Sequence, residues 1–332
     1  MIQMPSILEK LAPVARKIPG IRFIYHQSQA LQILAADRQH NYYKNLSPEK
    51  YPQELAKWYH SVTGKQLNLD DPRTFDEKIQ WMKLYDSTPL KTQLADKYLV
   101  RDYIKEKIGE EYLIPLLGVW DSFDEIDFDT LPNQFVLKAN HGSGWNIIVR
   151  DKSTFDKTDA KKKFDKWMKT NFAYKAGLEL HYKDIQPKII AEEYIENDGG
   201  NLYDYKVHCF GGKAVYIQYI GDRATHTTRE GWFNKNWTIM SFTDGCYPKY
   251  DSKIPVPHNL LELLSLSELL ASHFSYVRVD FYVLNDSSFK FGEMTFTPAS
   301  GVHKWFSDGE MTPDEVDLML GCLIPTLKER NS

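Results

Sequence analysis

The chain has 332 residues, 42% of them hydrophobic and 26% charged, and its net charge is −4 at pH 7. This length is enough for two or three subdomains with buried cores, and the charge gives no case for nucleic-acid binding. No apolar run reaches the length needed to span a bilayer. The three cysteines, Cys209, Cys246 and Cys322, are scattered and odd in number. They argue against a disulfide framework or a zinc site and favour a reducing, cytoplasmic compartment.

Residues 1–95 are predicted to form a helical N-terminal region without a strand. Within it, the stretch 1–24 mixes prolines with basic residues and lacks the continuous apolar segment of a secretory signal. A weak contact of this stretch with a membrane surface is compatible with its composition, but a solvated first helix is the simpler interpretation. Further along, Thr74 is a suitable helix N-cap, and Glu77 completes a capping box three residues later.

From about residue 112 the pattern changes to short apolar runs separated by turns. Strands are expected at residues 112–117, 134–138, 146–150, 188–195, 204–210, 213–220, 276–284 and 289–296, and helices at 94–108, 155–182, 259–273 and 313–327. Because tight turns such as Gly211-Gly212 join neighbouring runs, the sheets are expected to be antiparallel. The predicted fold class is therefore α+β.

The stretch 135–149 has the pattern of a strand, a tight turn and a second strand. Gly142 and Gly144 flank Ser143 in the turn, where glycine lets the backbone come close to a ligand. The N–H groups of these three residues can converge on anionic oxygens, and Lys138 would add a positive charge. No helix follows, so the turn is neither a Walker A loop nor a dinucleotide fingerprint. Taken alone, such a turn near a lysine is more often only a hairpin turn.

Strand alternation places carboxylates on one face of a predicted hairpin. Arg278 and Asp280 share a face of one strand, and Glu293 and Thr295 share a face of the next. Pairing these strands can set Asp280 against Glu293 and Thr295, which would make an oxygen-rich floor for a hard cation bound with nucleotide phosphates. A solvated sheet face, with its acids balanced by Arg278, is the plainer alternative.

The segment 189–196 leaves an apolar strand with acids at its end, and the chain re-enters a strand at Asp204-Tyr205-Lys206. An extended linker with free backbone groups can read the edge of an adenine ring, and an acid beyond it can bind a ribose. A charged strand end is the common alternative.

Together and in this order, these segments resemble the ATP-grasp superfamily over about residues 96–301. The resemblance implies an ATP-grasp fold, in which a central subdomain (96–195) and a C-terminal subdomain (196–332) clamp ATP behind the helical region 1–95. ATP and Mg²⁺ are the implied cofactors. The residues that the resemblance assigns to ATP are Lys97, Lys138, His141, Gly142, Ser143, Gly144, Glu192, Glu193, Tyr194, Ile195 and Asp204.

The resemblance assigns the metal ion to Asp280, Glu293 and Thr295, and the reacting groups to Arg278, Arg223 and Lys206. Superfamily members usually have Glu-x-Asn where this chain has Glu293-x-Thr295, so one metal ligand would be a weaker, neutral hydroxyl. The usual N-terminal α/β subdomain is not visible in the sequence.

More narrowly, four motifs resemble the TupA-like branch, which is named for teichuronopeptide synthesis. They are Arg73-Thr74-Phe75-x-Glu77-Lys78-x-Gln80-Trp81, Lys138-x-Asn140-His141-Gly142-Ser143-Gly144, Asp204-Tyr205-Lys206 and Gly292-Glu293-x-Thr295-Phe296. Members of this branch occur in bacterial capsule and surface-polysaccharide loci, and gene context often labels them glycosyltransferases.

The resemblance implies a ligase that joins a carboxylate to an amine through an acyl phosphate and releases ADP. The carboxylate would be a uronic acid of a bacterial surface polysaccharide, or an amino acid. A glycosyltransferase and a non-catalytic nucleotide-binding module are the alternatives. A nucleotide-sugar glycosyltransferase is expected to carry an Asp-x-Asp-like metal motif after a Rossmann-type strand, and the sequence shows no such motif. A module without turnover tends to lose groups such as Lys138, Asp280 and Glu293, which this chain keeps.

Overall fold

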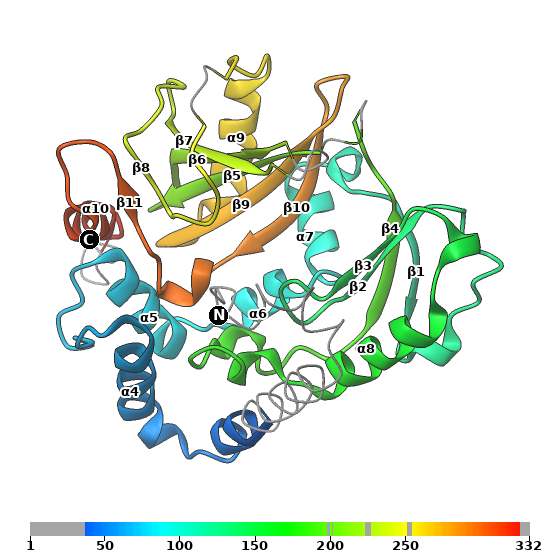
Figure 1. The fold of residues 1–332 in the computed structure, drawn as a ribbon, viewed down its shortest axis with the longest axis horizontal. Coiled ribbons are helices and arrows are strands. Elements are labelled where there is room, and N and C mark those ends of the chain that lie inside the picture. The colour runs from blue at the N-terminus through cyan, green and yellow to red at the C-terminus, as the bar shows by residue number, and fades with distance from the viewer. Residues whose placement is uncertain (1–36, 198–199, 201, 223–226, 251–253, 326–332) are drawn as a thin grey trace, which may run out of the picture.

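A computed structural model describes residues 37–197, 200, 202–222, 227–250 and 254–325. Two antiparallel sheets form its framework (Figure 1). The first has the strand order β1-β4-β2-β3 and consists of β1 (Leu116–Trp120), β2 (Phe135–Ala139), β3 (Asn146–Val149) and β4 (Ile189–Glu193). The second has the order β10-β9-β5-β6-β7 and consists of β5 (Tyr203–Phe210), β6 (Lys213–Gly221), β7 (Arg229–Asn234), β9 (Tyr276–Val283) and β10 (Phe289–Thr295). A small ribbon pairs β8 (Phe242–Thr243) with β11 (Phe306–Ser307).

Helices precede the first sheet, as expected for the described part of the N-terminal region. They are α4 (Tyr51–Thr63), α5 (Phe75–Tyr85), α6 (Pro89–Ala95) and α7 (Val100–Lys107). The predicted capping box is present, because the Thr74 hydroxyl accepts from the Glu77 N–H at 3.2 Å and the Glu77 carboxylate accepts from the Thr74 N–H at 3.1 Å. The single helix expected over 94–108 is instead two helices, because the backbone is extended at Asp96.

The expected helix 155–182 is also shorter in the structure. Helix α8 spans Lys157–Lys169, and two 3-10 turns follow, η5 (Phe172–Tyr174) and η6 (Leu180–Tyr182). Between these turns, Gly177 and Leu178 have φ angles of +64° and +59°. Two successive left-handed residues cannot continue a right-handed helix. The helix prediction was therefore wrong after Lys169, and the irregular segment that replaces it is part of the candidate site.

The two faces of the second sheet differ in chemistry. Helix α9 (Leu260–Ala271) packs on one face, where Val207, Val279 and Leu263 are fully buried. Because side chains alternate along a strand, the residues between them, including Lys206 and Asp280, lie on the other face. The apolar face secures the sheet. The other face is charged around Lys206 and Asp280, and the rest of it packs Phe210, Trp232 and Tyr276 against α5 and α10 in a second hydrophobic core.

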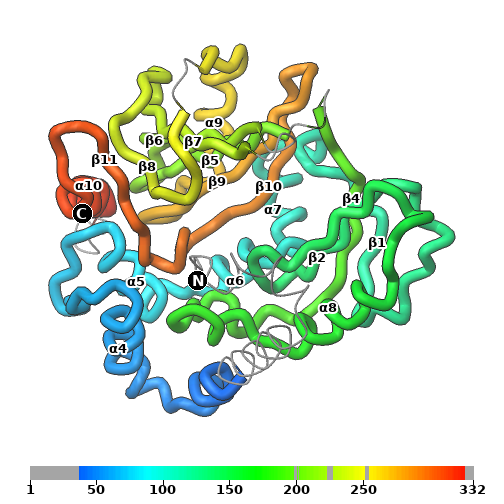
Figure 2. Tube along the Cα trace, in the orientation of Figure 1, coloured from blue at the N-terminus to red at the C-terminus, as the bar shows by residue number. Residues whose placement is uncertain are grey.

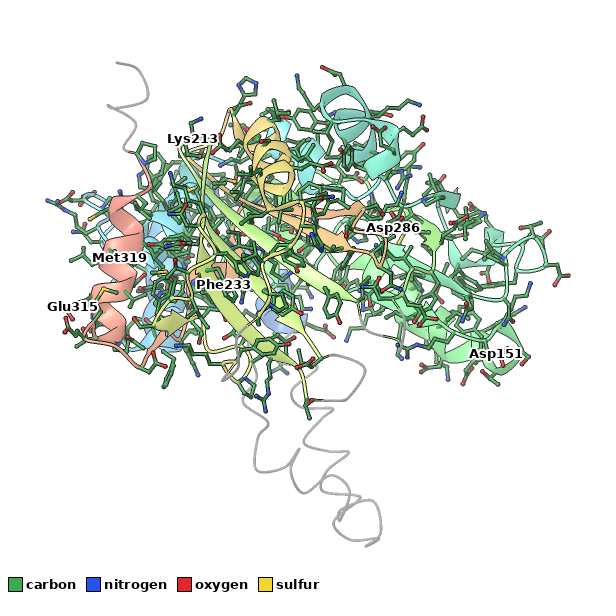
Figure 3. All side chains as sticks on the ribbon, turned by 90° about the horizontal axis from the view of Figure 1, so that it is seen from above. Asp151, Lys213, Phe233, Asp286, Glu315 and Met319 are labelled. Atoms are coloured by element: carbon green, nitrogen blue, oxygen red, sulfur yellow. The ribbon has the colours of Figure 1, made fainter. Side chains whose placement is uncertain are left out.

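Helix α10 (Pro313–Cys322) packs against α5, so segments from the two ends of the described chain lie side by side (Figure 2). The Asp317 carboxylate accepts from the Asp76 N–H at 3.0 Å. Contact is so close that a Cβ on Gly321 would lie 2.2 Å from the Arg73 carbonyl oxygen. Figure 3 shows Glu315 on α10 and Asp151 after β3 at opposite ends of the molecule.

No helix in the described part of the chain is long and apolar enough to cross a membrane. The membrane contact considered for residues 1–24 falls outside the described residues, and so does Arg223. The borders expected at residues 95 and 195 stay predictions.

Replacing Thr74 with alanine removes the N-cap of α5, and we expect it to lower the free energy of unfolding by about 1 kcal/mol. Urea unfolding measures the change. Thr158→Ala, an exposed threonine in the first turn of α8, is the matched control. Equal stability of the two variants would show that this capping box adds nothing.

Candidate active site

The floor of the site is a row of charged side chains across β5, β9 and β10. Lys206 is the register partner of Asp280, which is the register partner of Glu293. The Asp280 carboxylate receives Arg278 Nε and Nη2, both at 2.7 Å, and Lys206 Nζ at 2.5 Å. Lys206 also lies 2.9 Å from the Asp204 carboxylate. Three strands thus hold alternating charges in one buried network.

This network keeps its buried groups ionised. Burial alone would raise the pKa of Asp280, but Arg278 and Lys206 lower it below its ordinary value. Burial would likewise lower the pKa of Lys206, but Asp204 and Asp280 raise it. A buried charge is tolerated when an opposite charge and hydrogen bonds compensate its lost hydration. The floor is therefore fully charged at neutral pH.

Glu293 and Thr295 extend the floor along β10, on the side of Arg278. The Glu293 carboxylate lies 3.1 Å from Arg278 Nη2 and accepts from the Thr295 hydroxyl at 3.0 Å. A bulge at Gly292 lets β10 present both residues to Arg278. Burial and Asp280 would raise the pKa of Glu293, but Lys97, Arg278 and Lys206 lower it. The predicted strand alternation is thus observed, since these side chains meet on one face.

The donor set of Asp280, Glu293 and Thr295 fits a magnesium ion that is also held by phosphate oxygens. Among the residues that the structure describes, no three His, Cys, Asp or Glu side chains are grouped to hold a metal ion. Mg²⁺ commonly takes only one or two carboxylates and completes its shell with water and substrate phosphates. Both carboxylates are ionised, and Glu293 keeps a third of its side chain exposed.

A second charged cluster lies on the first sheet. Lys138 on β2 forms an ion pair with Glu192 on β4, and Arg101 on α7 lies 3.1 Å from the same carboxylate. Arg101 also donates to the Ile114 carbonyl at 2.9 Å. Sequence analysis did not identify Arg101, because only the fold brings α7 to β4. Glu192 therefore forms ion pairs with two basic side chains, Lys138 and Arg101.

The turn 140–145 that joins β2 to β3 carries the predicted glycine-rich loop. Lys97 Nζ donates to the Gly142 carbonyl at 2.5 Å, which ties the segment before α7 to this loop. A Cβ on Gly142 would lie 2.5 Å from the Trp145 ring, and Gly144 has a φ of +71°. Both positions therefore require glycine, one for close packing and one for its left-handed backbone.

One cavity of about 320 Å³ joins the two sheets. Ser143 of the glycine-rich loop lines it on one side, and Arg278, Glu293 and Thr295 line it on the other. Lys97 and Glu293 also interact across this space. Burial lowers the pKa of Lys97, and the Glu293 carboxylate opposes that shift. The structure thus brings Ser143 of the predicted loop and two of the predicted metal ligands, Glu293 and Thr295, to one cavity.

The remaining predicted residues are placed less directly. His141 is buried, and its ring nitrogens face the Trp167 carbonyl and the Asn140 side chain, so protein groups already engage this ring. The Glu193 N–H donates to the Pro115 carbonyl at 3.0 Å, within the sheet. The Tyr194 hydroxyl lies 3.2 Å from Arg150 Nε. Ile195 is partly buried just beyond β4. The roles of these residues stay predictions.

Another part of the cavity lining is a strained turn, Pro298–Gly301, which contributes Pro298, Ala299 and Ser300. Ala299 and Ser300 have φ angles of +48° and +53°, in the left-handed region that non-glycine residues rarely adopt. Two side chains of α5 hold this turn. Lys83 Nζ donates to the Ser300 carbonyl at 2.6 Å, and the Gln80 amide donates to the carbonyls of Ser300 and Gly301 at 2.9 and 2.6 Å.

Sequence analysis also missed Lys175, Glu179 and Thr297, which line the cavity. The first two fall where a helix was expected, so their positions gave no signal. Tertiary packing, which the local pattern does not encode, assembles this wall.

A protein-family model described as TupA-like ATPgrasp matches residues 77–325, well over half of the chain. No curated protein matches the chain by sequence. The match confirms the family resemblance and the ATP-grasp fold expected from the sequence. It also agrees with the expected enzyme class, an ATP-grasp ligase, and with ATP and Mg²⁺ as cofactors.

Several solved structures resemble the chain at low identity. An L-amino acid ligase from Bacillus licheniformis has a TM-score of 0.41 and 12% identity, covering 68% of this chain and 50% of its own. An N5-carboxyaminoimidazole synthetase from Staphylococcus aureus has a TM-score of 0.34 and 13% identity, covering 62% and 45%. A biotin carboxylase from Campylobacter jejuni has a TM-score of 0.37 and 14% identity, covering 71% and 48%. The chain spans about half the length of these proteins.

Lys83 gives a pH-dependent prediction, because burial lowers its pKa from 10.5 to about 8. Between these values the unfolded chain binds the proton and the folded chain does not, so stability rises with pH. Relative to Lys83→Met, the wild type should gain up to about 3 kcal/mol between pH 8 and pH 10.5. Urea unfolding of both proteins across this range measures the gain. A difference that stays constant with pH would contradict the assignment.

Proposed function

Because the chain belongs to the TupA-like ATP-grasp family, we propose that it is an ATP-dependent ligase that joins a carboxylate to an amine. The γ-phosphoryl group of ATP moves to the carboxylate, and the amine then displaces phosphate from the acyl phosphate. The observation that carries this proposal is the cavity between Ser143 and the Arg278–Glu293 pair. Ser143, in a loop suited to phosphates, and the ionised Glu293 carboxylate line the same cavity, which supports this proposal.

Each charged group has a distinct task in this proposal. Lys97 and Lys138, with the N–H groups of the glycine-rich loop, neutralise the phosphate oxygens. Asp280, Glu293 and Thr295 would hold Mg²⁺, which would supply charge neutralisation at the transferring phosphoryl group. The planar guanidinium of Arg278 suits the oxygens of the acyl phosphate. No nucleophilic side chain is needed, because positioning and electrostatics supply the catalysis.

Lys206 takes a supporting role in this proposal. Its ammonium group is 2.5 Å from Asp280 and 2.9 Å from Asp204, so it serves to hold both carboxylates in place. Arg223, the other predicted contact of the acyl phosphate, lies outside the described residues.

We propose a uronic acid of a bacterial surface polysaccharide, or an amino acid, as the carboxylate. Arg278 and Lys175 offer positive charge at the cavity, while Phe172 and Tyr182 offer aromatic surface to a sugar ring. The enzyme would act in the bacterial cytoplasm, where ATP is available. Its three cysteines are unpaired in the structure, which suits a reducing compartment.

ADP release with a panel of uronic acids and amines tests this function. Hydroxylamine added in place of the amine should convert the acyl phosphate to a hydroxamate. Hydroxamate that appears only with ATP, Mg²⁺ and a carboxylate supports the ligase. Sugar transfer from a nucleotide sugar, without any hydroxamate, would instead favour a glycosyltransferase. ATP binding without either product would favour a module without turnover.

Lys138→Ala should weaken ATP binding by about tenfold or more, because a charge-assisted hydrogen bond to phosphate is lost and Glu192 loses a partner. Calorimetric titration of ATP measures the affinity. Lys163→Ala removes an exposed lysine that pairs with Asp159 and is the matched control. Equal losses of ATP affinity in the two variants would contradict the assignment of Lys138 to the nucleotide site.

Glu293→Gln should keep the fold and lower ATP turnover by about a hundredfold, because it removes the charge at nearly constant shape. Thermal unfolding checks the fold, and ADP release at several Mg²⁺ concentrations checks the activity. Glu310→Gln changes an exposed acid and should leave turnover at the parent rate. Parent-level turnover in Glu293→Gln would place the metal elsewhere.

A further inference from the structure

Glu179 is a buried acid on the cavity wall that the proposed mechanism leaves without a task. It lies in the irregular segment between η5 and η6, is 4% exposed, and lines the same cavity as Arg278 and Glu293. The Thr297 hydroxyl donates to its Oε1 at 2.5 Å. This hydrogen bond fixes the carboxylate against the strained turn, on the wall that faces the reacting groups.

The groups around Glu179 do not neutralise it by direct contact. Among the described residues it forms no ion pair within 4.0 Å. Lys83, Lys175, Ser300 and Tyr182 complete its surroundings. Lys83 acts on Glu179 at longer range, and its own Nζ is engaged by Ser300 and Gln80. Burial raises the pKa of Glu179, and Lys83, Thr297 and Ser300 only partly oppose this shift.

A buried carboxylate without a charged contact is stabilised by a cation that reaches it from the cavity. Asp280 and Glu293 are paired with Arg278, and the proposed function assigns both to Mg²⁺. Glu179 is therefore the acid at the cavity that is left to meet a positively charged substrate. In an amide-forming reaction, the substrate with that charge is the protonated amine.

We propose that Glu179 binds the ammonium group of the acceptor amine and removes its proton, so that the neutral amine can attack the acyl phosphate beside Arg278. This inference rests on the ligase function proposed above and adds the position and activation of the second substrate. It makes Glu179 a catalytic residue, with Thr297 and Lys83 as the residues that position it.

In the amide-forming step, the ammonium ion of the acceptor gives one proton to the Glu179 carboxylate. The nitrogen lone pair then forms the C–N bond to the acyl carbon. The bond between that carbon and the phosphate oxygen breaks, and phosphate leaves with the electron pair. The second proton of the nitrogen goes to the departing phosphate, and Glu179 returns its proton to solvent. No oxidant or reductant is required.

Two amines of similar size separate this role from a structural one. Hydroxylamine is largely unprotonated at neutral pH, whereas methylamine is almost entirely an ammonium ion. Only methylamine therefore needs Glu179 as a base. The assay uses ATP, Mg²⁺ and the carboxylate that gives the most hydroxamate, and it measures the ratio of methylamide to hydroxamate for each variant.

Glu179→Gln should lower this ratio about a hundredfold at neutral pH, the size typical of a lost general base. The ratio should recover as the pH rises and methylamine loses its own proton, and Glu179→Asp should restore part of it. Glu310→Gln is the control and should leave the ratio at the wild-type value.

An unchanged ratio in Glu179→Gln would overturn the proposal, whether both products form at the wild-type rate or both fall by the same factor. A lowered ratio that does not recover at high pH would overturn it too, because the defect would then not be one of deprotonation. Failure of the wild type to form any hydroxamate would be a different result, since it would refute the ligase function itself.

Discussion

The pairing of Arg278 with Asp280 is the interaction on which the candidate site depends. Asp280 accepts two hydrogen bonds from Arg278 and a third from Lys206, while Arg278 also reaches Glu293. Removing one partner of such a buried network leaves an uncompensated charge, which costs about 3–5 kcal/mol. The network therefore fixes where the Arg278, Asp280 and Glu293 side chains lie on the charged part of the second sheet.

The part of the cavity lining formed by the turn Pro298–Gly301 depends on residues far away in the sequence. Gln80 and Lys83 of α5 hold the turn Pro298–Gly301 in a left-handed conformation that a non-glycine chain avoids. Helices that look like a separate N-terminal region thus shape the active-site cavity. The turn follows Thr297, whose hydroxyl donates to Glu179 on the irregular segment after α8.

Local patterns in the sequence were enough to predict the floor of the site. Alternation along two strands placed Arg278, Asp280, Glu293 and Thr295 on one face, and the structure brings these side chains together. What those patterns could not predict depends on tertiary packing. The expected helix over 155–182 ends at Lys169, where Thr170 is extended, and the left-handed Gly177 and Leu178 lie in the irregular segment that carries Glu179 to the cavity. For the same reason, no pattern pointed to the ion pair of Arg101 with Glu192.

The most direct test of the account is to follow the oxygen atoms of the carboxylate. The carboxylate substrate is labelled with the heavy oxygen isotope, and the phosphate released during amide formation is analysed by mass spectrometry. An acyl phosphate requires one labelled oxygen to pass into the phosphate in each turnover. Phosphate that carries no label, while ATP is consumed and product forms, would contradict the central claim that the cavity between the two sheets activates a carboxylate by phosphorylation.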